Sequence, residues 1–431
     1  MVFTSPTNFT LFKQRRKRLI EEIKAHYQGS KGIVLLGAGF ESDRYAFRQE
    51  SSFYYLTGIL EPAVMLCVYL DGPEILYVPQ FATPRSLWTH VTVEGPGDQS
   101  KAGVDEVRYL GKKIPGYSCR STFMRDTYQT IMDDIQAYVV GNQAKVYTLL
   151  DITREGYQPH INIYDNFMSL IPELCTSTID VSPLVHEMRR IKDEYEIDMM
   201  YKAIQLTNMA HTAAASLIEP GICEYELQAA VESVFTQVAG ACPAFPSIVA
   251  TGKNATILHY TQRDAQLKAD DLVVIDIGAE YGLYAADLTR TYPVSKKFTP
   301  RQREIYQLVL DTQAYVESIA KPGMYLKNNT YPENSLHHLA VKFLESKGMA
   351  QYLYHGIGHY VGLDVHDVGD LSLPIDVGEV FTIEPGLYIP QENIGVRIED
   401  NYVMADDGIV CLSYELPKQL AETEKLVAAR L

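Results

Sequence analysis

The chain has a single tryptophan, no paired cysteine motif, no long apolar run and no excess of positive charge. Its 431 residues include one Trp, Trp88, and six Cys, and no two cysteines form a C-x-x-C pair. That pattern is typical of reduced, structural thiols in a cytosolic protein. We find no apolar run long enough to span a bilayer and no signal-peptide pattern. The formal net charge of −16 argues against non-specific nucleic-acid binding. We therefore expect a cytoplasmic protein without membrane or nucleic-acid partners.

The first part of the chain alternates helical and strand-like segments. We predict a helix over residues 9–27, whose basic run 13–18 forms an exposed face, and strands at 32–38, 63–70 and 74–81. Alternating elements of this kind indicate an α/β domain. The predicted fold class is therefore α/β (α+β), with an N-terminal α/β domain over residues 1–178 and a catalytic domain over residues 179–431.

The second domain contains an apparent internal duplication. A capping box at Asp193 and Glu196 begins one long helix, and Thr299-Pro300 with Gln302 begins another. Each helix ends at a Pro-Gly pair, and a further helix and strand-like segments follow it. Residues 193–294 and 299–405 are therefore predicted to be two similar halves that share one site.

Five residues of the last third carry the chemistry. Each lies in an apolar or glycine-rich setting where an unpaired charge is costly. They are Asp276, Asp287, His359, Glu384 and Glu399. Two divalent cations would cancel the charge of the four carboxylates, so the set predicts a two-metal hydrolytic site.

The segment around the two aspartates indicates a hairpin. A two-residue turn at Tyr281-Gly282 would place Asp276 directly opposite Asp287 on one face of the sheet. Carboxylates in that arrangement repel unless a cation lies between them. A solvated hairpin with two chance aspartates is the alternative, and the apolar run 273–275 argues against it for Asp276 but less so for Asp287.

Four motifs carry a resemblance to a known family. DIGAEYGLYAADLTRTYPV, HGIGHYVGLDVHDVG, FTIEPGLYI and GVRIED resemble the aminopeptidase P/prolidase branch of the pita-bread metallopeptidases over residues 185–410, and residues 45–58 resemble the N-terminal domain of that branch. The resemblance implies a pita-bread catalytic domain with pseudo-two-fold symmetry and a dinuclear site. It also implies a metalloaminopeptidase that cleaves the Xaa-Pro bond of peptides whose second residue is proline.

The resemblance also implies roles. Asp276 would bind one metal, His359 and Glu384 the other, and Asp287 and Glu399 would bridge the pair. A hydroxide between the ions would attack the carbonyl of the first residue, and Glu384 would pass a proton to the proline nitrogen. One histidine among four carboxylates is an oxygen-rich set, which favours manganese over a thiolate-loving metal.

The remaining candidates surround this set. By resemblance, His259 would lie near the substrate amide, His366 would stabilise the oxyanion, and His355 would orient substrate or product. Each alone is more often a structural histidine. Arg397 would order a bridging carboxylate or bind a substrate carboxylate, with a simple salt bridge as an equal alternative. Trp88 is either a pocket wall or a core or interface anchor.

Two other functions remain open at this stage. A prolidase, which cleaves only Xaa-Pro dipeptides, would use the same residues but needs a group that captures the proline carboxylate. A non-catalytic binding protein on the same scaffold is disfavoured, because all five ligand positions are filled. The resemblance also implies a homodimer or homotetramer.

Overall fold

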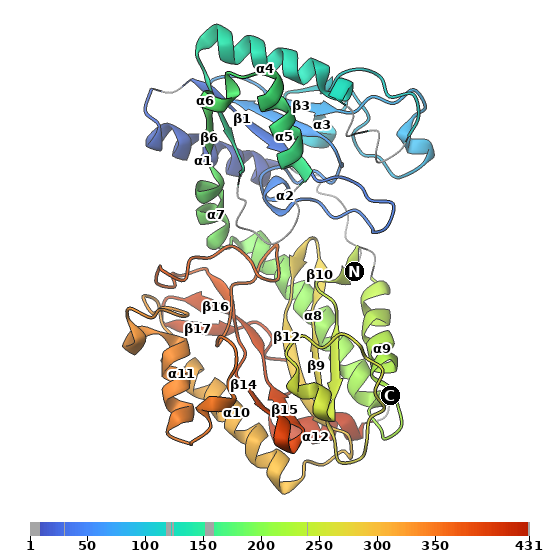
Figure 1. Ribbon diagram of the computed structural model, residues 1–431, viewed down its shortest axis with the longest axis vertical. Coiled ribbons are helices and arrows are strands. Elements are labelled where there is room, and N and C mark those ends of the chain that lie inside the picture. The colour runs from blue at the N-terminus through green and yellow to red at the C-terminus, as the bar shows by residue number, and fades with distance from the viewer. Residues whose placement is uncertain are drawn as a thin grey trace. The chain divides into compact units, whose positions relative to one another are not determined.

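The structure is a computed structural model that describes residues 9–29, 31–117, 122, 125–150, 159–238 and 240–429 (Figure 1). The chain divides into two compact units, of which the N-terminal one ends at Met188 and the C-terminal one begins at Arg189. Within the described ranges, no helix combines the length and the apolar character that a bilayer crossing needs. Cys119 lies outside these ranges, and the other five cysteines are free thiols.

The N-terminal unit is built on a mixed six-stranded sheet with the order β4-β3-β2-β1-β5-β6. Its elements are α1 (Thr10–His26), β1 (Gly32–Gly37), α2 (Ser51–Thr57), β2 (Met65–Tyr69), β3 (Glu74–Val78), α3 (Gln99–Ala102), β4 (Glu106–Tyr109), α4 (Gln129–Asn142), β5 (Lys145–Thr148), α5 (Pro159–Leu170), α6 (Leu174–Ser177), β6 (Thr178–Asp180) and α7 (Ser182–Arg190). The helix and the three strands predicted for this region are confirmed, with bounds within a few residues.

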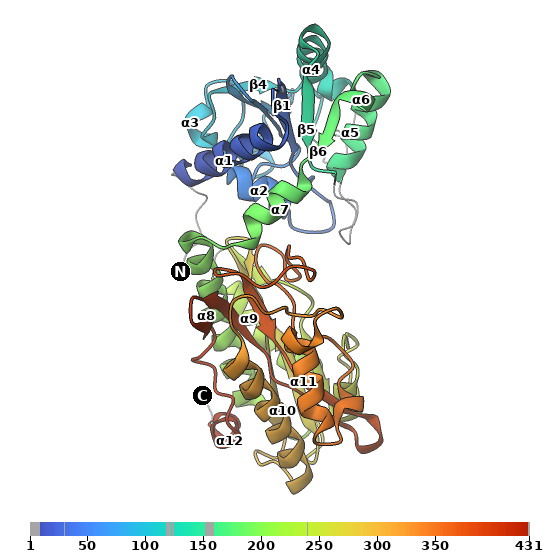
Figure 2. The same ribbon diagram turned by 90° about the vertical axis from the view of Figure 1, so that its left-hand side faces the viewer.

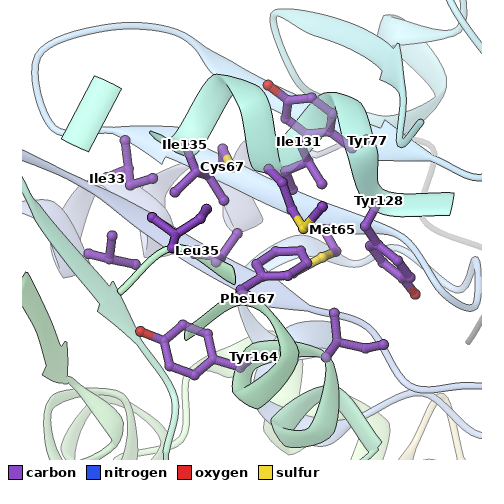
Figure 3. Close-up of a cluster of buried hydrophobic side chains, with 14 of the residues drawn as sticks. Ile33, Leu35, Met65, Cys67, Tyr77, Tyr128, Ile131, Ile135, Tyr164 and Phe167 are labelled. Carbon is purple, nitrogen blue, oxygen red and sulfur yellow. The ribbon is translucent and has the colours of Figure 1, made fainter. Parts of the chain in front are cut away.

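Alternate residues of the central strands form the core of this unit. Side chains two apart on a strand share a face, and Ile33 and Leu35 of β1 lie beside Met65 and Cys67 of β2. Figure 3 shows this face with the side chains that pack on it from α4 and α5, namely Ile131, Ile135, Tyr164 and Phe167. The sheet is thus held against its helices by aliphatic and aromatic burial.

The basic run of α1 is not simply an exposed face. Arg15 and Arg16 are 4% and 1% exposed. Arg16 donates to both carboxylate oxygens of Glu74 in β3, at 2.9 and 2.6 Å. The prediction is therefore wrong for these two residues, because an acid 58 positions away pairs with Arg16 and permits its burial.

The C-terminal unit repeats one order of elements. Its elements are α8 (Glu194–Leu217), α9 (Glu224–Thr236), β7 (Ala241–Pro243), β8 (Ile248–Thr251), β9 (Leu272–Ile277), β10 (Ala279–Tyr281), β11 (Tyr284–Ala285), β12 (Leu288–Pro293), α10 (Pro300–Ile319), α11 (Leu336–Glu345), β13 (Val380–Ile383), β14 (Gly386–Ile389), β15 (Ile394–Arg397), β16 (Asp400–Ala405), β17 (Gly408–Cys411) and α12 (Leu420–Ala428). Both halves read helix, helix, strands, so the predicted order is confirmed.

The two predicted helix starts are also present. Asp193 and Glu196 form a reciprocal capping box at α8, and Thr299 and Gln302 form one at α10. Within each half the helices pack on each other. Figure 1 shows strands between the two helix pairs, and Figure 2 gives the view from the side. A bridge between Thr289 and Glu399 joins the strands of the two halves.

The hairpin register differs from the prediction. β9 and β12 pair so that Asp276 opposes Thr289, two residues beyond Asp287. The turn lies at Gly282 and Leu283, both with positive φ, at 59° and 69°. A turn one residue later shifts the pairing by two residues, and an even shift keeps the same side chains on the same face. The predicted pairing is therefore wrong, whereas the expectation that both aspartates share a face does not depend on it.

Candidate active site

The five predicted ligand residues come from both halves of the C-terminal unit. Asp276 lies in β9, and Asp287 lies directly before β12. Glu384 follows β13, and Glu399 lies between β15 and β16, whereas His359 lies in an irregular loop. Strand ends of the two halves therefore supply the carboxylates, and the loop supplies the imidazole.

Three of these side chains form a compact group. One ligand atom each from Asp287, His359 and Glu399 can be chosen so that all lie within 4.8 Å of one another. The Nε2 atom of His359 is 3.3 Å from Asp287 Oδ2 and 3.9 Å from Glu399 Oε1. It is also 3.6 Å from Oε1 of Glu384, which extends the group to a fourth residue.

Asp276 is linked to Glu399 of the group by hydrogen bonds that run through Arg397 and Thr289. Its Oδ2 accepts a 2.6 Å hydrogen bond from Arg397 Nη2. Arg397 also donates to the Tyr388 hydroxyl at 2.7 Å and to Thr289 Oγ1 at 3.1 Å. Arg397 thus forms a buried ion pair with the carboxylate of Asp276, a candidate metal ligand.

Burial and mutual repulsion act on the carboxylates. Burial and then the charge of Asp276 raise the pKa of Asp287 well above its usual range. Burial and the charge of Asp287 do the same to the pKa of Glu399. Burial also raises the pKa of Glu384. The protein alone thus provides too little positive charge for this cluster.

The donor set fits a divalent cation. The Oδ1 atoms of Asp276 and Asp287 are buried and accept no hydrogen bond from the described residues. Buried carboxylate oxygens without partners are costly, and hard cations prefer such oxygens. His359 Nδ1 lies 3.1 Å from the Tyr360 carbonyl, so the tautomer that donates there leaves Nε2 free to bind a metal.

Several supporting residues were not singled out from the sequence. The Thr289 hydroxyl donates to Glu399 Oε2 at 2.6 Å. The Asn401 side chain accepts from the amide of Asp287 and donates to its carbonyl, at 3.1 and 2.8 Å. Thr289 and Asn401 each lie two residues from a candidate ligand, which is the only local signal the sequence contains for them.

The other candidate histidines differ in how closely they approach the group. The His366 ring lies 4.3 Å from the His359 ring, centroid to centroid, in an edge-to-face arrangement. His355 has Nδ1 3.4 Å from Glu384 Oε2 and Nε2 2.9 Å from the Tyr388 hydroxyl. His259 is exposed. Burial and the charge of Arg397 lower the pKa of His355 to about 3, and His259 adds to this effect.

Trp88 lies in the N-terminal unit, where its side chain is 65% exposed. Its ring stacks on that of Tyr117, with 6.1 Å between the ring centroids. It is therefore not part of the buried core of that unit.

Comparisons with known proteins agree with this arrangement. Residues 198–406 match Metallopeptidase family M24, and residues 12–115 match the aminopeptidase P N-terminal domain. The chain is 32% identical to the Xaa-Pro aminopeptidase of Haemophilus influenzae, with 96% of each chain covered. It is 30% identical to the Xaa-Pro aminopeptidase of Escherichia coli, with 97% of each covered.

Solved structures show the same fold. Aminopeptidase PepP of Pseudomonas aeruginosa superposes with a TM-score of 0.83 at 28% identity, covering 100% of this chain and 99% of that one. Zinc-substituted aminopeptidase P of Escherichia coli superposes with a TM-score of 0.80 at 27% identity and covers 100% of both chains. The donor set and these matches together support divalent metal ions at the site. The chain belongs to the aminopeptidase P branch of metallopeptidase family M24, and it is a metal-dependent peptidase.

Proposed function

We propose that this chain releases the first residue from peptides whose second residue is proline. The observation that carries the proposal is the close group of Asp287 and Glu399, which are buried, with His359 and Glu384, which are partly buried, in a chain that aligns over nearly its whole length with Xaa-Pro aminopeptidases. Such an enzyme is useful because proline lacks the N–H group that general peptidases bind.

The donor set and the family support divalent metal ions, and we further propose which residues bind them and which metal they are. Asp276, Asp287, His359, Glu384 and Glu399 would hold the ions, Asp276 on one side of the group, His359 and Glu384 on the other, and Asp287 and Glu399 between them. Manganese is the proposed metal, because four carboxylates and one imidazole form a hard donor set. When bound, the ions supply Lewis acidity and activate water near neutral pH.

The protein groups around the ions bind substrate and move protons. Glu384 passes a proton to the proline nitrogen. Its Oε1 lies 3.6 Å from Nε2 of His359, and its Oε2 lies 3.4 Å from Nδ1 of His355. His366 binds the carbonyl oxygen of the first peptide bond, and His259 binds its amide. Arg397 orders Asp276 through their 2.6 Å ion pair. His355 orients substrate or product from its bond to Tyr388.

Three substrates test the proposal. The manganese-loaded chain should release the free first amino acid from an Xaa-Pro-Yaa tripeptide, and a chelator should abolish this release. An Xaa-Ala-Yaa tripeptide is the matched control for the requirement for proline. If the chain cleaves the Xaa-Pro dipeptide but not the Xaa-Pro-Yaa tripeptide, it is a prolidase. If it cleaves neither of these two peptides, it is not a peptidase specific for proline.

The remaining assignments stay predictions. They are the domain limits 1–178 and 179–431, the cytoplasmic location and the homodimer or homotetramer. Size-exclusion chromatography with light scattering tests the last of these.

A further inference from the structure

A buried carboxylate outside the metal group organises one loop of the C-terminal unit. Glu224, the first residue of α9, is 0% exposed. Its Oε1 accepts hydrogen bonds from the Thr251 amide at 2.8 Å and from Asn254 Nδ2 at 3.1 Å. Its Oε2 accepts from the Tyr260 hydroxyl at 2.9 Å and from the Ala265 amide at 3.1 Å. Both oxygens are thus engaged by uncharged donors.

All four donors belong to residues 251–265. This segment leaves β8 and passes through the short helix η4 (Gly252–Thr256) before it reaches Ala265. Hydrogen bonds to an ionised acceptor are stronger than neutral ones, and a buried carboxylate that lost its donors would be strongly destabilised. One side chain therefore fastens the two ends and the middle of the segment to α9.

The segment is also held from a second side. A Cβ atom on Gly395 of β15 would come within 1.9 Å of the Ala255 carbonyl oxygen, so the two backbones are in direct contact. The Tyr260 ring packs in a small apolar cluster with Ala255. β15 also carries Arg397, so the segment rests on the strand that supplies a residue of the active site.

His259 is the exposed residue directly before this fixed tyrosine. The segment that carries it lies against β15, the strand that also carries Arg397. We propose that Glu224 is a positioning residue that holds segment 251–265 so that His259 faces the bound substrate. The inference rests on the function and on the role of His259 proposed above, and it assigns no catalytic contact to Glu224 itself.

An isosteric substitution tests the hydrogen bonds of Glu224 without changing the size of the side chain. Glu224→Gln keeps the side-chain shape but replaces one accepting oxygen by an NH2 group that only donates. Two of the four donors then lose their acceptor. Glu232→Gln is the matched control, because Glu232 lies on the same helix and accepts from Gln228 and Ser247, at 2.6 and 3.0 Å, without bonding to the segment.

The first measurement is amide hydrogen exchange on the full-length, manganese-loaded chain. In Glu224→Gln, exchange within residues 251–265 should rise by about tenfold or more, because tenfold is about the smallest change expected for even one of the two hydrogen bonds to a charged group that are lost. Exchange in β9 should stay unchanged, as should exchange of both segments in Glu232→Gln. Unchanged exchange of residues 251–265 in Glu224→Gln would overturn the anchoring.

The second measurement is a double-mutant cycle on kcat/KM with an Xaa-Pro-Yaa peptide. Glu224→Gln should lower kcat/KM by about 10- to 100-fold, as expected when a reacting group is displaced by about 1 Å. In a His259→Ala background the same substitution should cost less than about threefold, because the group it positions is gone. Tyr260→Phe removes one donor and should reproduce part of both effects.

The outcomes separate the two proposals. An equal loss of kcat/KM in both backgrounds would show that Glu224 supports folding alone, and normal activity of His259→Ala would also overturn the positioning role. If the parent chain fails to cleave the peptide, the proposed function fails and with it the positioning role. The exchange measurement then still decides whether Glu224 holds the segment.

Discussion

Replacing Asp287 by asparagine should stabilise the metal-free protein while removing its response to metal. Asp287 is 5% exposed, and Glu399 is 2% exposed. Their ligand atoms lie within 4.8 Å of each other. Two negative charges 4.8 Å apart repel by about 3.5 kcal/mol at an effective dielectric constant of about 20, and by more at a shorter separation. This repulsion, or the protonation that relieves it, is a cost to the metal-free fold.

The substitution removes that cost and also removes a ligand. We expect the free energy of unfolding of chelated Asp287→Asn to rise by about 1–3 kcal/mol, which is less than the full repulsion because the raised pKa of Asp287 already lets protonation relieve part of it. In the parent, metal at 100 times its dissociation constant should add about 2.7 kcal/mol. In the variant this increment should nearly vanish.

Urea unfolding with and without manganese measures both quantities. Asp311→Asn, an exposed aspartate of α10 bonded only to Gln307 among the described residues, is the control and should stay within about 0.5 kcal/mol of the parent in both conditions. A chelated Asp287→Asn protein that is less stable than the parent, yet is still stabilised by metal, would refute the argument from charge.

Three further predictions concern His366, Arg397 and His211. His366→Ala should lower kcat while metal analysis shows an unchanged metal content, because the side chain faces His359 without being a proposed ligand. Arg397→Met should destabilise the chelated protein by about 3–5 kcal/mol in urea unfolding, because it leaves Asp276 buried without its partner. His211 is fully buried, and burial lowers its pKa to about 3. Its stabilising effect is therefore present above about pH 6.5 and is lost as the pH falls towards 3, and His211→Gln should reduce the slope of stability against pH there by up to about 1.4 kcal/mol per unit.

Local patterns predicted the helices of the C-terminal unit well. The starts of α8 and α10 rest on capping boxes that lie within four consecutive residues. Signals of this kind are complete in the sequence, because donor and acceptor are neighbours along the chain. The repeated order of helices and strands could be predicted for the same reason.

Pairings between distant residues could not be predicted. The bond from Thr289 to Glu399 joins positions 110 apart. The turn at Gly282 and Leu283 places a leucine at φ 69°, which is uncommon for a residue with a branched side chain and gives no sequence signal. The burial of Arg16 likewise depends on Glu74, which belongs to another element.

The ligand residues are an intermediate case. Their apolar surroundings indicated burial, and their shared charge indicated cations. The distances between the ligand side chains, in contrast, depend on how the strands of the two halves pair, as at the bridge between Thr289 and Glu399. Asn401 and Arg397, which hold Asp287 and Asp276, depend on that pairing, so their contacts became evident only in the folded chain.

The central claim is that these five residues hold two divalent ions that the peptidase reaction requires. The most direct test adds manganese to the chelated chain in known equivalents while recording cleavage of an Xaa-Pro-Yaa tripeptide. Our account predicts that activity reaches its maximum at two bound equivalents per chain and stays near zero in Asp287→Asn. Full activity at one equivalent, or activity that persists in the chelated protein, would contradict it.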